Sequence, residues 1–211
     1  MRRAVVSALS TILLTGCSLF GVRSGYEEPR YEVVDRIDGA IEVRRYAPRL
    51  AAETVVSGPE EEAVRDEAFR ILFDYISGAN RADASVAMTV PVETAARGES
   101  ITMTAPVETA AADGRYAMRF FLPSSYTRAS VPQPTDPRVR IVTFPETISA
   151  VLSFNGSTSP GHVASQQERL LRALESSIWR PTGPPAALFY DPPWTIPFLR
   201  RNEIAVPVAE L

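Results

Sequence analysis

Alternating apolar and polar residues recur along most of the chain, and this spacing is typical of half-buried β-strands. Residues 31–46 (YEVVDRIDGAIEVRRY) alternate on both sides of Asp38-Gly39, a dipeptide that favours a hairpin turn. Residues 50–57 (LAAETVVS) form a third extended run. Further runs lie at 116–123, 138–154, 185–193 and 202–211, and the second of these is divided near Pro145 into two predicted strands.

Two segments instead repeat their apolar residues at helical spacing. The first follows Ser57-Gly58-Pro59-Glu60, where Ser57 and Glu60 have the spacing of a capping box, and it ends before Gly78. The second extends from about 161 to 178. The predicted apolar faces are Val64, Ala68, Ile71, Leu72 and Tyr75 in the first helix, and Val163, Leu170, Leu171, Leu174 and Ile178 in the second.

Each half of the chain therefore contains strands, one helix and further strands. Tight turns between alternating runs favour antiparallel pairing. We predict an α+β domain in which a distorted antiparallel β-barrel of about eight strands packs against two helices, with a pseudo-twofold repeat.

One motif occurs twice, as SVAMTVPVETA at 85–95 and SITMTAPVETA at 100–110, with eight of eleven positions identical. Residues 96–99 suit a turn, so the two copies are expected to form an antiparallel hairpin with both apolar rows on one face. Its prolines, Pro91 and Pro106, cannot donate to a ladder and must lie at an edge, a bulge or a strand end. Met88 and Met103 then either fill the core or line a ligand-binding wall.

The first residues have the composition of an export signal. Arg2 and Arg3 precede an apolar run over residues 4–14, which is too short to cross about 30 Å of hydrocarbon. The next residues, Leu14-Thr15-Gly16-Cys17, resemble the bacterial lipobox, in which the cysteine thiol receives a diacylglyceryl group. An ordinary signal peptide followed by a chance cysteine is the alternative.

The lipobox interpretation divides the chain into three parts. We expect residues 1–16 to be a lipoprotein signal peptide and residues 17–28 to be a tether anchored through acyl chains, palmitate included, on Cys17. Residues 29–211 then form the folded domain. The expected location is the bacterial cell envelope, and Ser18 favours the periplasmic side of the outer membrane.

Composition excludes several functional classes. Once Cys17 is lipidated, no cysteine remains for disulfides, thiol catalysis or metal binding. Without residues 1–16 the chain has 20 arginines and 25 acidic residues, a formal charge of −5, so nucleic-acid binding is not expected.

An enzyme is the main alternative to a binding protein. Glu93 and Glu108 occupy equivalent places in the two motif copies, and paired carboxylates can do acid–base chemistry. Strand-end glutamates are more often solvated, and the chain has a single histidine, no zinc-protease or phosphate-loop motif and no cysteine nucleophile. We therefore expect no enzymatic activity.

Four stretches resemble the SOUL/heme-binding protein family. SGANR at 77–81 followed by VAMTVPV at 86–92 is similar to its signature, and FLPSSYT, VPQPTDPRVRI and YDPPWTIPFLRRNEIAV follow in family order. The resemblance covers almost all of the chain after Cys17. It implies a distorted antiparallel barrel with two helices, and heme or another tetrapyrrole as a reversible ligand in a shallow apolar groove along the first helix.

Carried onto this chain, the resemblance implies a heme groove formed by Arg65, Phe69, Arg70, Leu72, Phe73, Met88 and Met103. The chain departs from the family in having Asp66 and Asp74 where a basic residue near the propionates is expected. Heme iron takes His, Met, Tyr or Cys ligands. His162, at the start of the second helix, is a weak candidate metal ligand, and Met118 is one in principle.

The expected function is thus a lipid-anchored envelope protein that binds heme or a related apolar ligand without catalysis. The alternative is an envelope protein-interaction module that has lost heme binding, with YDPPWTIPF at 190–198 as an exposed recognition surface. In the first case Trp194 and Phe198 are expected to pack as a lid on the barrel, and residues 200–203 to fix the last strand.

Overall fold

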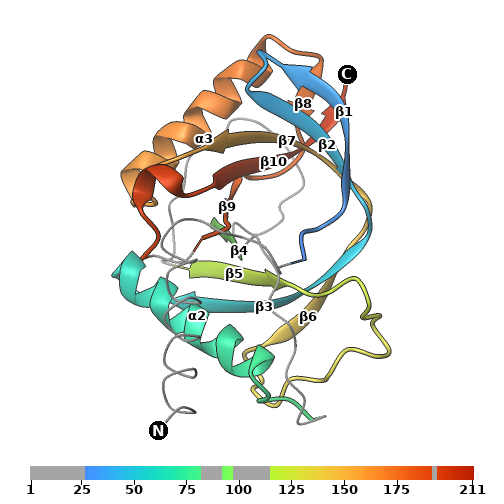
Figure 1. Cartoon of the computed structure of the whole chain (residues 1–211), viewed down its shortest axis with the longest axis vertical. Coiled ribbons are helices and arrows are strands. Elements are labelled where there is room, and N and C mark those ends of the chain that lie inside the picture. Colours follow the sequence, from blue (N-terminus) through green and yellow to red (C-terminus); the bar gives the residue numbers. More distant parts are fainter. Residues whose placement is uncertain (1–26, 82–91, 97–114, 192–193) are drawn as a thin grey trace, which may run out of the picture.

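The strands form one curved antiparallel sheet, with the helices on one of its faces (Figure 1). The computed structural model describes residues 27–81, 92–96, 115–191 and 194–211. Within these ranges the strands are β1 (Tyr31–Ile37), β2 (Ile41–Tyr46), β3 (Arg49–Ser57), β4 (Val92–Ala96), β5 (Arg115–Phe121), β6 (Arg140–Phe144), β7 (Thr147–Phe154), β8 (Trp179–Pro181), β9 (Ala186–Phe189) and β10 (Asn202–Glu210). The helices are α2 (Glu61–Ile76), α3 (Pro160–Glu175) and the short 3₁₀ helix η1 (Pro197–Leu199).

The order of the strands has the predicted pseudo-twofold symmetry. It is β1-β2-β7-β10-β9-β4-β5-β3-β6, with β8 added beside β10. Outward from the β9–β4 pair, β10, β7 and β2 on one side correspond to β5, β3 and β6 on the other. The helices agree with this relation, because β3 leads into α2 and β7 leads into α3. The predicted fold class is therefore confirmed, with ten described strands where about eight were expected.

Local turn chemistry explains the first hairpin. Asp38 and Gly39 have φ angles of 51° and 66°, left-handed conformations that suit these residue types, and with Ala40 they form a three-residue hairpin loop. Ile37 pairs with Ile41 across this turn. The hairpin predicted at this dipeptide is confirmed.

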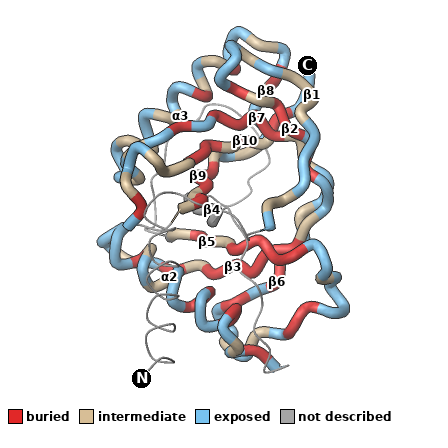
Figure 2. The backbone as a smooth tube through the Cα atoms, in the orientation of Figure 1, coloured by how far each residue is buried: buried red, intermediate tan, exposed pale blue. Residues whose placement is uncertain are grey.

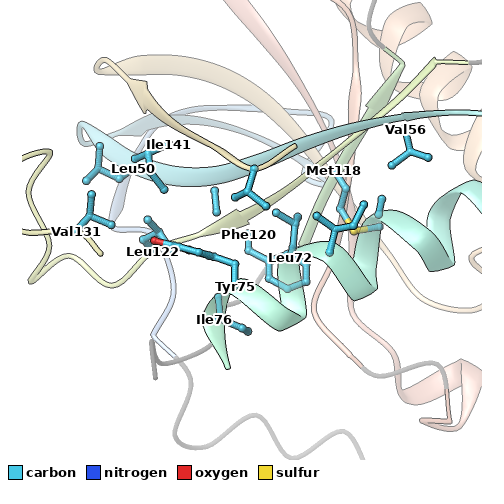
Figure 3. Close-up of a cluster of buried hydrophobic side chains, with 14 of the residues drawn as sticks. Leu50, Val56, Leu72, Tyr75, Ile76, Met118, Phe120, Leu122, Val131 and Ile141 are labelled. Atoms are coloured by element: carbon cyan, nitrogen blue, oxygen red, sulfur yellow. The ribbon is translucent and has the colours of Figure 1, made fainter. Parts of the chain in front are cut away.

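Both helices bury the faces that their spacing predicted. In α2 the residues Val64, Ala68, Ile71, Leu72 and Tyr75 are buried against β3 and β5, and Figure 3 shows Leu72 and Tyr75 between the helix and the strands. In α3 Leu170 and Leu174 are fully buried against β7 and β10, while Val163 and Leu171 are partly buried. The prediction that Ile178 belongs to this face is wrong, because α3 ends at Glu175 and Ile178 is exposed.

The predicted capping box of α2 is wrong. Ser57 belongs to β3, the N-cap residue is Glu60, and no side chain caps the helix. The three-residue spacing is present in the sequence, but pairing of Ser57 with Arg115 of β5 holds its backbone in the sheet.

The predicted hairpin between the two motif copies is wrong where the structure describes it. Residues 92–94 of the first copy, in β4, pair with β5 on one side and with β9 on the other. Both edges of this stretch are therefore occupied. Residues 85–91 of the first copy and all of the second copy, with Met88, Met103 and Glu108, lie outside the described residues.

Buried residues concentrate on the central strands (Figure 2). They form one cluster beneath α2, a second beneath α3 and a smaller third one on the other face of the sheet around Phe121, Leu188 and Tyr190. None of the helices in the described ranges is long and apolar enough to cross a membrane.

Candidate ligand-binding site

Two phenylalanines lie exposed on α2 at the place where the family resemblance puts the groove. Phe69 is 40% exposed and Phe73 is 45% exposed. Their rings stack with centroids 5.9 Å apart and an interplanar angle of 16°. Residues four apart lie on one side of a helix, so the two rings form one exposed apolar surface beside the buried face.

This surface continues into the sheet. The edge of Phe69 meets the buried ring of Phe120 in β5, with centroids 5.4 Å apart. Backbone register extends the row, because Val92 of β4 pairs with Phe120 on one side and with Phe189 of β9 on the other. Phe120 and Phe189 each pack in a cluster beneath a helix, so both side chains lie on the same face of the sheet. The strip of sheet between α2 and α3 thus carries aromatic side chains on its helix-covered face.

The charges on α2 are mainly acidic. Arg65, half-buried, lies four residues before Phe69 and on the same side of the helix. Arg70 is exposed, with Asp66 and Asp74 four residues to either side. Over its length α2 has five acidic residues and two arginines, a net formal charge of −3. A propionate-bearing ligand would therefore meet few cations here.

Leu72 is not a groove residue. Its side chain is fully buried in the cluster beneath α2, close to Phe120 (Figure 3). The prediction that it lines the groove is wrong, because the helical turn directs it toward the sheet while Phe73 points outward. Met118 is buried in the same cluster and is a core residue.

His162 lies far from the aromatic surface of α2. It is in the first turn of α3, with its ring 5.5 Å from that of Phe154 in β7. Its Nε2 atom is buried and has no hydrogen-bond partner among the described residues. Four strand spacings, about 19 Å, separate Phe154 from Phe120 across the sheet. In the described part of the chain no cluster of three or more His, Cys, Asp or Glu side chains could hold a metal ion.

The opposite face of the sheet, which we call the helix-free face, has buried charges. Glu203 of β10 is completely buried, and its Oε2 accepts hydrogen bonds from Tyr190 Oη at 2.6 Å and Arg44 Nη1 at 3.0 Å. Its Oε1 accepts from Arg201 Nη2 at 2.9 Å and Ser153 Oγ at 3.2 Å. Burial by itself would raise the pKa of Glu203, but Arg44, Tyr190 and Arg201 outweigh it and hold the pKa below its ordinary value.

A second buried carboxylate lies in the other half of the sheet. Glu53 of β3 accepts from Arg119 Nε and from Arg140 Nη2, each at 2.8 Å. These networks were missed from the sequence. Their only sequence signal is a charged residue alternating with core residues in a strand, and that signal does not say which charges meet. The expectation that residues 200–203 fix the last strand agrees with the bonds of Glu203 to Arg44 and Ser153 in neighbouring strands and of Arg201 to Glu28.

The predicted aromatic lid is also wrong. Trp194 is 62% exposed and Phe198 is 70% exposed, so neither covers the barrel. A cleft of about 250 Å³ lies instead between residues 27–30 and 121–128, with Leu50, Phe121 and Tyr126 among its walls. None of its lining residues belongs to α2.

Solved structures with the same fold include two with very different sequences. The crystal structure of the EcmrR C-terminal domain aligns with a TM-score of 0.58 and 10% identity, over 86% of this chain and 99% of that one. An uncharacterized conserved protein from Listeria innocua aligns with a TM-score of 0.52 and 13% identity, over 88% of this chain and 94% of that one. At these identities the likeness shows the fold alone. No curated protein matches the chain.

A family model gives the more specific result. The model described as SOUL heme-binding protein matches residues 26–207, which is most of the chain and all of the described sheet up to the middle of β10. The match includes α2 with its exposed phenylalanines and the strands on which the helix packs. The chain belongs to the SOUL heme-binding protein family.

Proposed function

We propose that this protein is a lipid-anchored, non-catalytic protein of the bacterial envelope that binds heme or a related tetrapyrrole on the exposed aromatic surface of α2. The observation that carries the proposal is the stacked, exposed pair Phe69 and Phe73, continued into the sheet by Phe120. Family membership supplies the class of ligand.

A flat, mostly apolar ligand suits this surface. Burying a whole phenylalanine side chain contributes about 1.5–3 kcal/mol, and both rings have a large fraction left to bury. Aromatic groups stacked in an offset arrangement add about 0.5–1.5 kcal/mol beyond burial. Most of the affinity would therefore come from ring contacts rather than from charge.

The cation best placed for a ligand carboxylate is Arg65. It lies in line with Phe69 and Phe73, whereas Arg70 lies between two aspartates. Heme, when bound, supplies redox chemistry at an iron that accepts axial ligands. The residues that fit it here hold and orient a flat ligand, which is the work of a carrier or buffer.

The anchor is supported by the sequence before the described residues. A basic start, a short apolar run and the Leu-Thr-Gly-Cys motif ending at Cys17 are typical of exported lipoproteins. Several acyl chains on one residue give a lasting attachment, since each buried methylene contributes about 0.8 kcal/mol.

The test is a hemin titration of residues 18–211, followed by the Soret absorbance. We expect saturable binding by the unchanged chain and loss of binding in the Phe69→Ser/Phe73→Ser variant. The Ile178→Ser variant is the matched control, because it removes an exposed apolar side chain from a place remote from α2. Arg65→Ala should weaken binding more than Arg70→Ala. A flat titration of the unchanged chain would overturn the proposal.

A further inference from the structure

An apolar segment is exposed next to the start of α3. Residues 194–199, which we call the aromatic segment, read WTIPFL, and only Thr195 is polar. Thr195 is buried, while Trp194 and Phe198 are turned out to solvent. Among the large apolar side chains that the structure describes as exposed, only the C-terminal Leu211 is more exposed than Phe198. The two large rings of the aromatic segment therefore lie outside the core.

Hydrogen bonds hold the backbone of the aromatic segment in place, so the exposure of its rings is part of the fold. Gly156 N donates to Pro197 O at 3.0 Å, and Asn155 Nδ2 donates to Arg200 O at 3.0 Å. Within the segment Leu199 N donates to Ile196 O at 2.9 Å and closes a turn of η1. These bonds tie the segment to the loop before α3, so the rings are presented in a fixed geometry.

The segment lies near the point where the tether joins the domain. Arg201 Nη1 lies 3.1 Å from Glu28 Oε1, so residue 28 is held beside the chain that leaves η1. Only two residues separate Phe198 from Arg201, a path of about 10 Å. Cys17 is ten residues before Glu27, which allows a reach of up to about 35 Å. A lipid on Cys17 would therefore keep the aromatic segment within reach of the membrane surface.

We propose that the aromatic segment docks on the lipid bilayer that holds the anchor, with Trp194 and Phe198 inserted at the level of the head groups. Tryptophan and phenylalanine suit this interface, because their rings bury apolar area there, and the indole N–H can remain hydrated. A bilayer is a better occupant than a soluble partner, because the anchor holds it at high effective concentration beside the segment. The inference rests on the anchor in the proposed function, but it has its own measurement.

The docked orientation has a consequence for the domain. Two attachment points, the tether and the aromatic segment, restrict its rotation, whereas a tether alone leaves it free to turn. The N-terminal end of α3, at Pro160, then faces the membrane. The C-terminal end of this helix points away from it.

The two tryptophans make this docking measurable. Trp194 is exposed, whereas Trp179 is buried and donates from Nε1 to Asp35 Oδ2 at 2.7 Å. The full-length lipidated protein is reconstituted in phosphatidylethanolamine–phosphatidylglycerol vesicles whose acyl chains are brominated. Bromine quenches tryptophan emission only at close range. We expect loss of the red-shifted Trp194 emission, and in the Trp194→Phe variant a remaining Trp179 emission that bromine does not change.

Two further variants separate docking from general apolar contact. Phe198→Ser should reduce the quenching of Trp194, and both side chains are exposed, so the change leaves the core intact. Ile178→Ser should leave quenching unchanged, because Ile178 lies past the opposite end of α3, a helix about 24 Å long.

Equal Trp194 emission in brominated and ordinary vesicles would overturn the inference, whether or not the protein floats with the vesicles. Flotation without quenching would keep the anchor and reject the docking, leaving a protein partner as the occupant of the segment. Failure of flotation together with absent quenching would reject both. Hemin binding is read from the Soret band and is independent of either result.

Discussion

The Nη1 atom of Arg44 lies 3.0 Å from Oε2 of Glu203, and both side chains are buried on the helix-free face of the sheet. Arg44 is in β2 and Glu203 is in β10, two strands that are separated by β7. Ser153 of β7 also donates to Glu203, and Arg44 itself lies over the ring of Tyr31 in β1. The network therefore links four neighbouring strands in one half of the sheet.

Glu203→Gln should destabilise the fold strongly. The change removes the buried carboxylate that Arg44 and Arg201 share, and breaking a buried ion pair from one side costs about 3–5 kcal/mol. Arg44 keeps its pair with Glu42 at 2.8 Å, which places the expected cost at the lower end of this range. Urea unfolding measures the loss. The matched control is Glu168→Gln, which removes an exposed carboxylate from the i,i+4 pair with Arg172 and should change stability by less than about 0.5 kcal/mol. A small effect at Glu203 would mean that the network contributes little.

Acid should remove the same contribution. Because the pKa of Glu203 in the fold is below its ordinary value of 4.5, the stability that it contributes is present above pH 4.5. It is lost as the pH falls through the lowered pKa. Unfolding free energies between pH 7 and pH 3 should therefore fall less steeply in Glu203→Gln than in the unchanged chain. Parallel curves would contradict this assignment.

Tyr75 should give the opposite dependence at high pH. Burial raises its pKa to about 12, and its hydroxyl donates to Pro132 O at 2.8 Å. A raised pKa means that the stability contributed by the neutral phenol is present below about pH 10 and is lost as the pH rises toward 12. Tyr75→Phe should cost about 1 kcal/mol at neutral pH and weaken the alkaline loss. Thermal melts from pH 8 to pH 11 provide the measurement.

Leu72 and Phe73 are neighbours with opposite expected roles. Leu72→Ala should destabilise the protein by about 2–5 kcal/mol, because it opens a cavity in the core beneath α2. Phe73→Ala should cost much less stability, since its ring is nearly half exposed, but it should weaken hemin binding. Unfolding and hemin titration of both variants test the pair. Weak hemin binding by a folded Leu72→Ala variant with an intact Phe73 would argue for a site inside the core.

The ligand's carboxylates should contribute little to binding. Because the net charge of −3 on α2 offsets the contact of one propionate with Arg65, esterifying both heme propionates should change the affinity little. Raising the salt concentration should not weaken hemin binding, since salt screens the repulsion between like charges. Tighter binding of hemin than of its dimethyl ester, lost at high salt, would instead indicate a dominant arginine clamp.

Cys17→Ala should abolish lipidation. The variant expressed in a bacterium fed labelled palmitate should incorporate no label, while the unchanged chain does. Cell fractionation then shows whether the protein leaves the membrane fraction. Label retained by the variant would place the acyl chains elsewhere.

The amino-acid pattern alone determined the elements and their order. Period-two alternation, a left-handed hairpin dipeptide and two amphipathic repeats depend on neighbours within a few residues. For this reason the hairpin at Asp38-Gly39, the buried faces of both helices and the fold class could be predicted from sequence. The exposed positions of Phe69 and Phe73 belong with these, because they follow from the resemblance and the helical period.

Tertiary structure alone decided which residues meet across the fold. The pattern at 92–94 shows a strand, but which strands take its two edges depends on β5 and β9, far away in the chain. Trp194 and Phe198 are predicted from the sequence to pack as a lid on the barrel, yet bonds to the loop before α3 hold their segment at the surface with both rings exposed. Glu203 belongs to the stretch predicted to fix the last strand, but only the pairing of β2, β7 and β10 in one sheet buries it among two arginines and a tyrosine. Local spacing specifies a face, whereas the partner on that face is set by packing between residues distant in sequence.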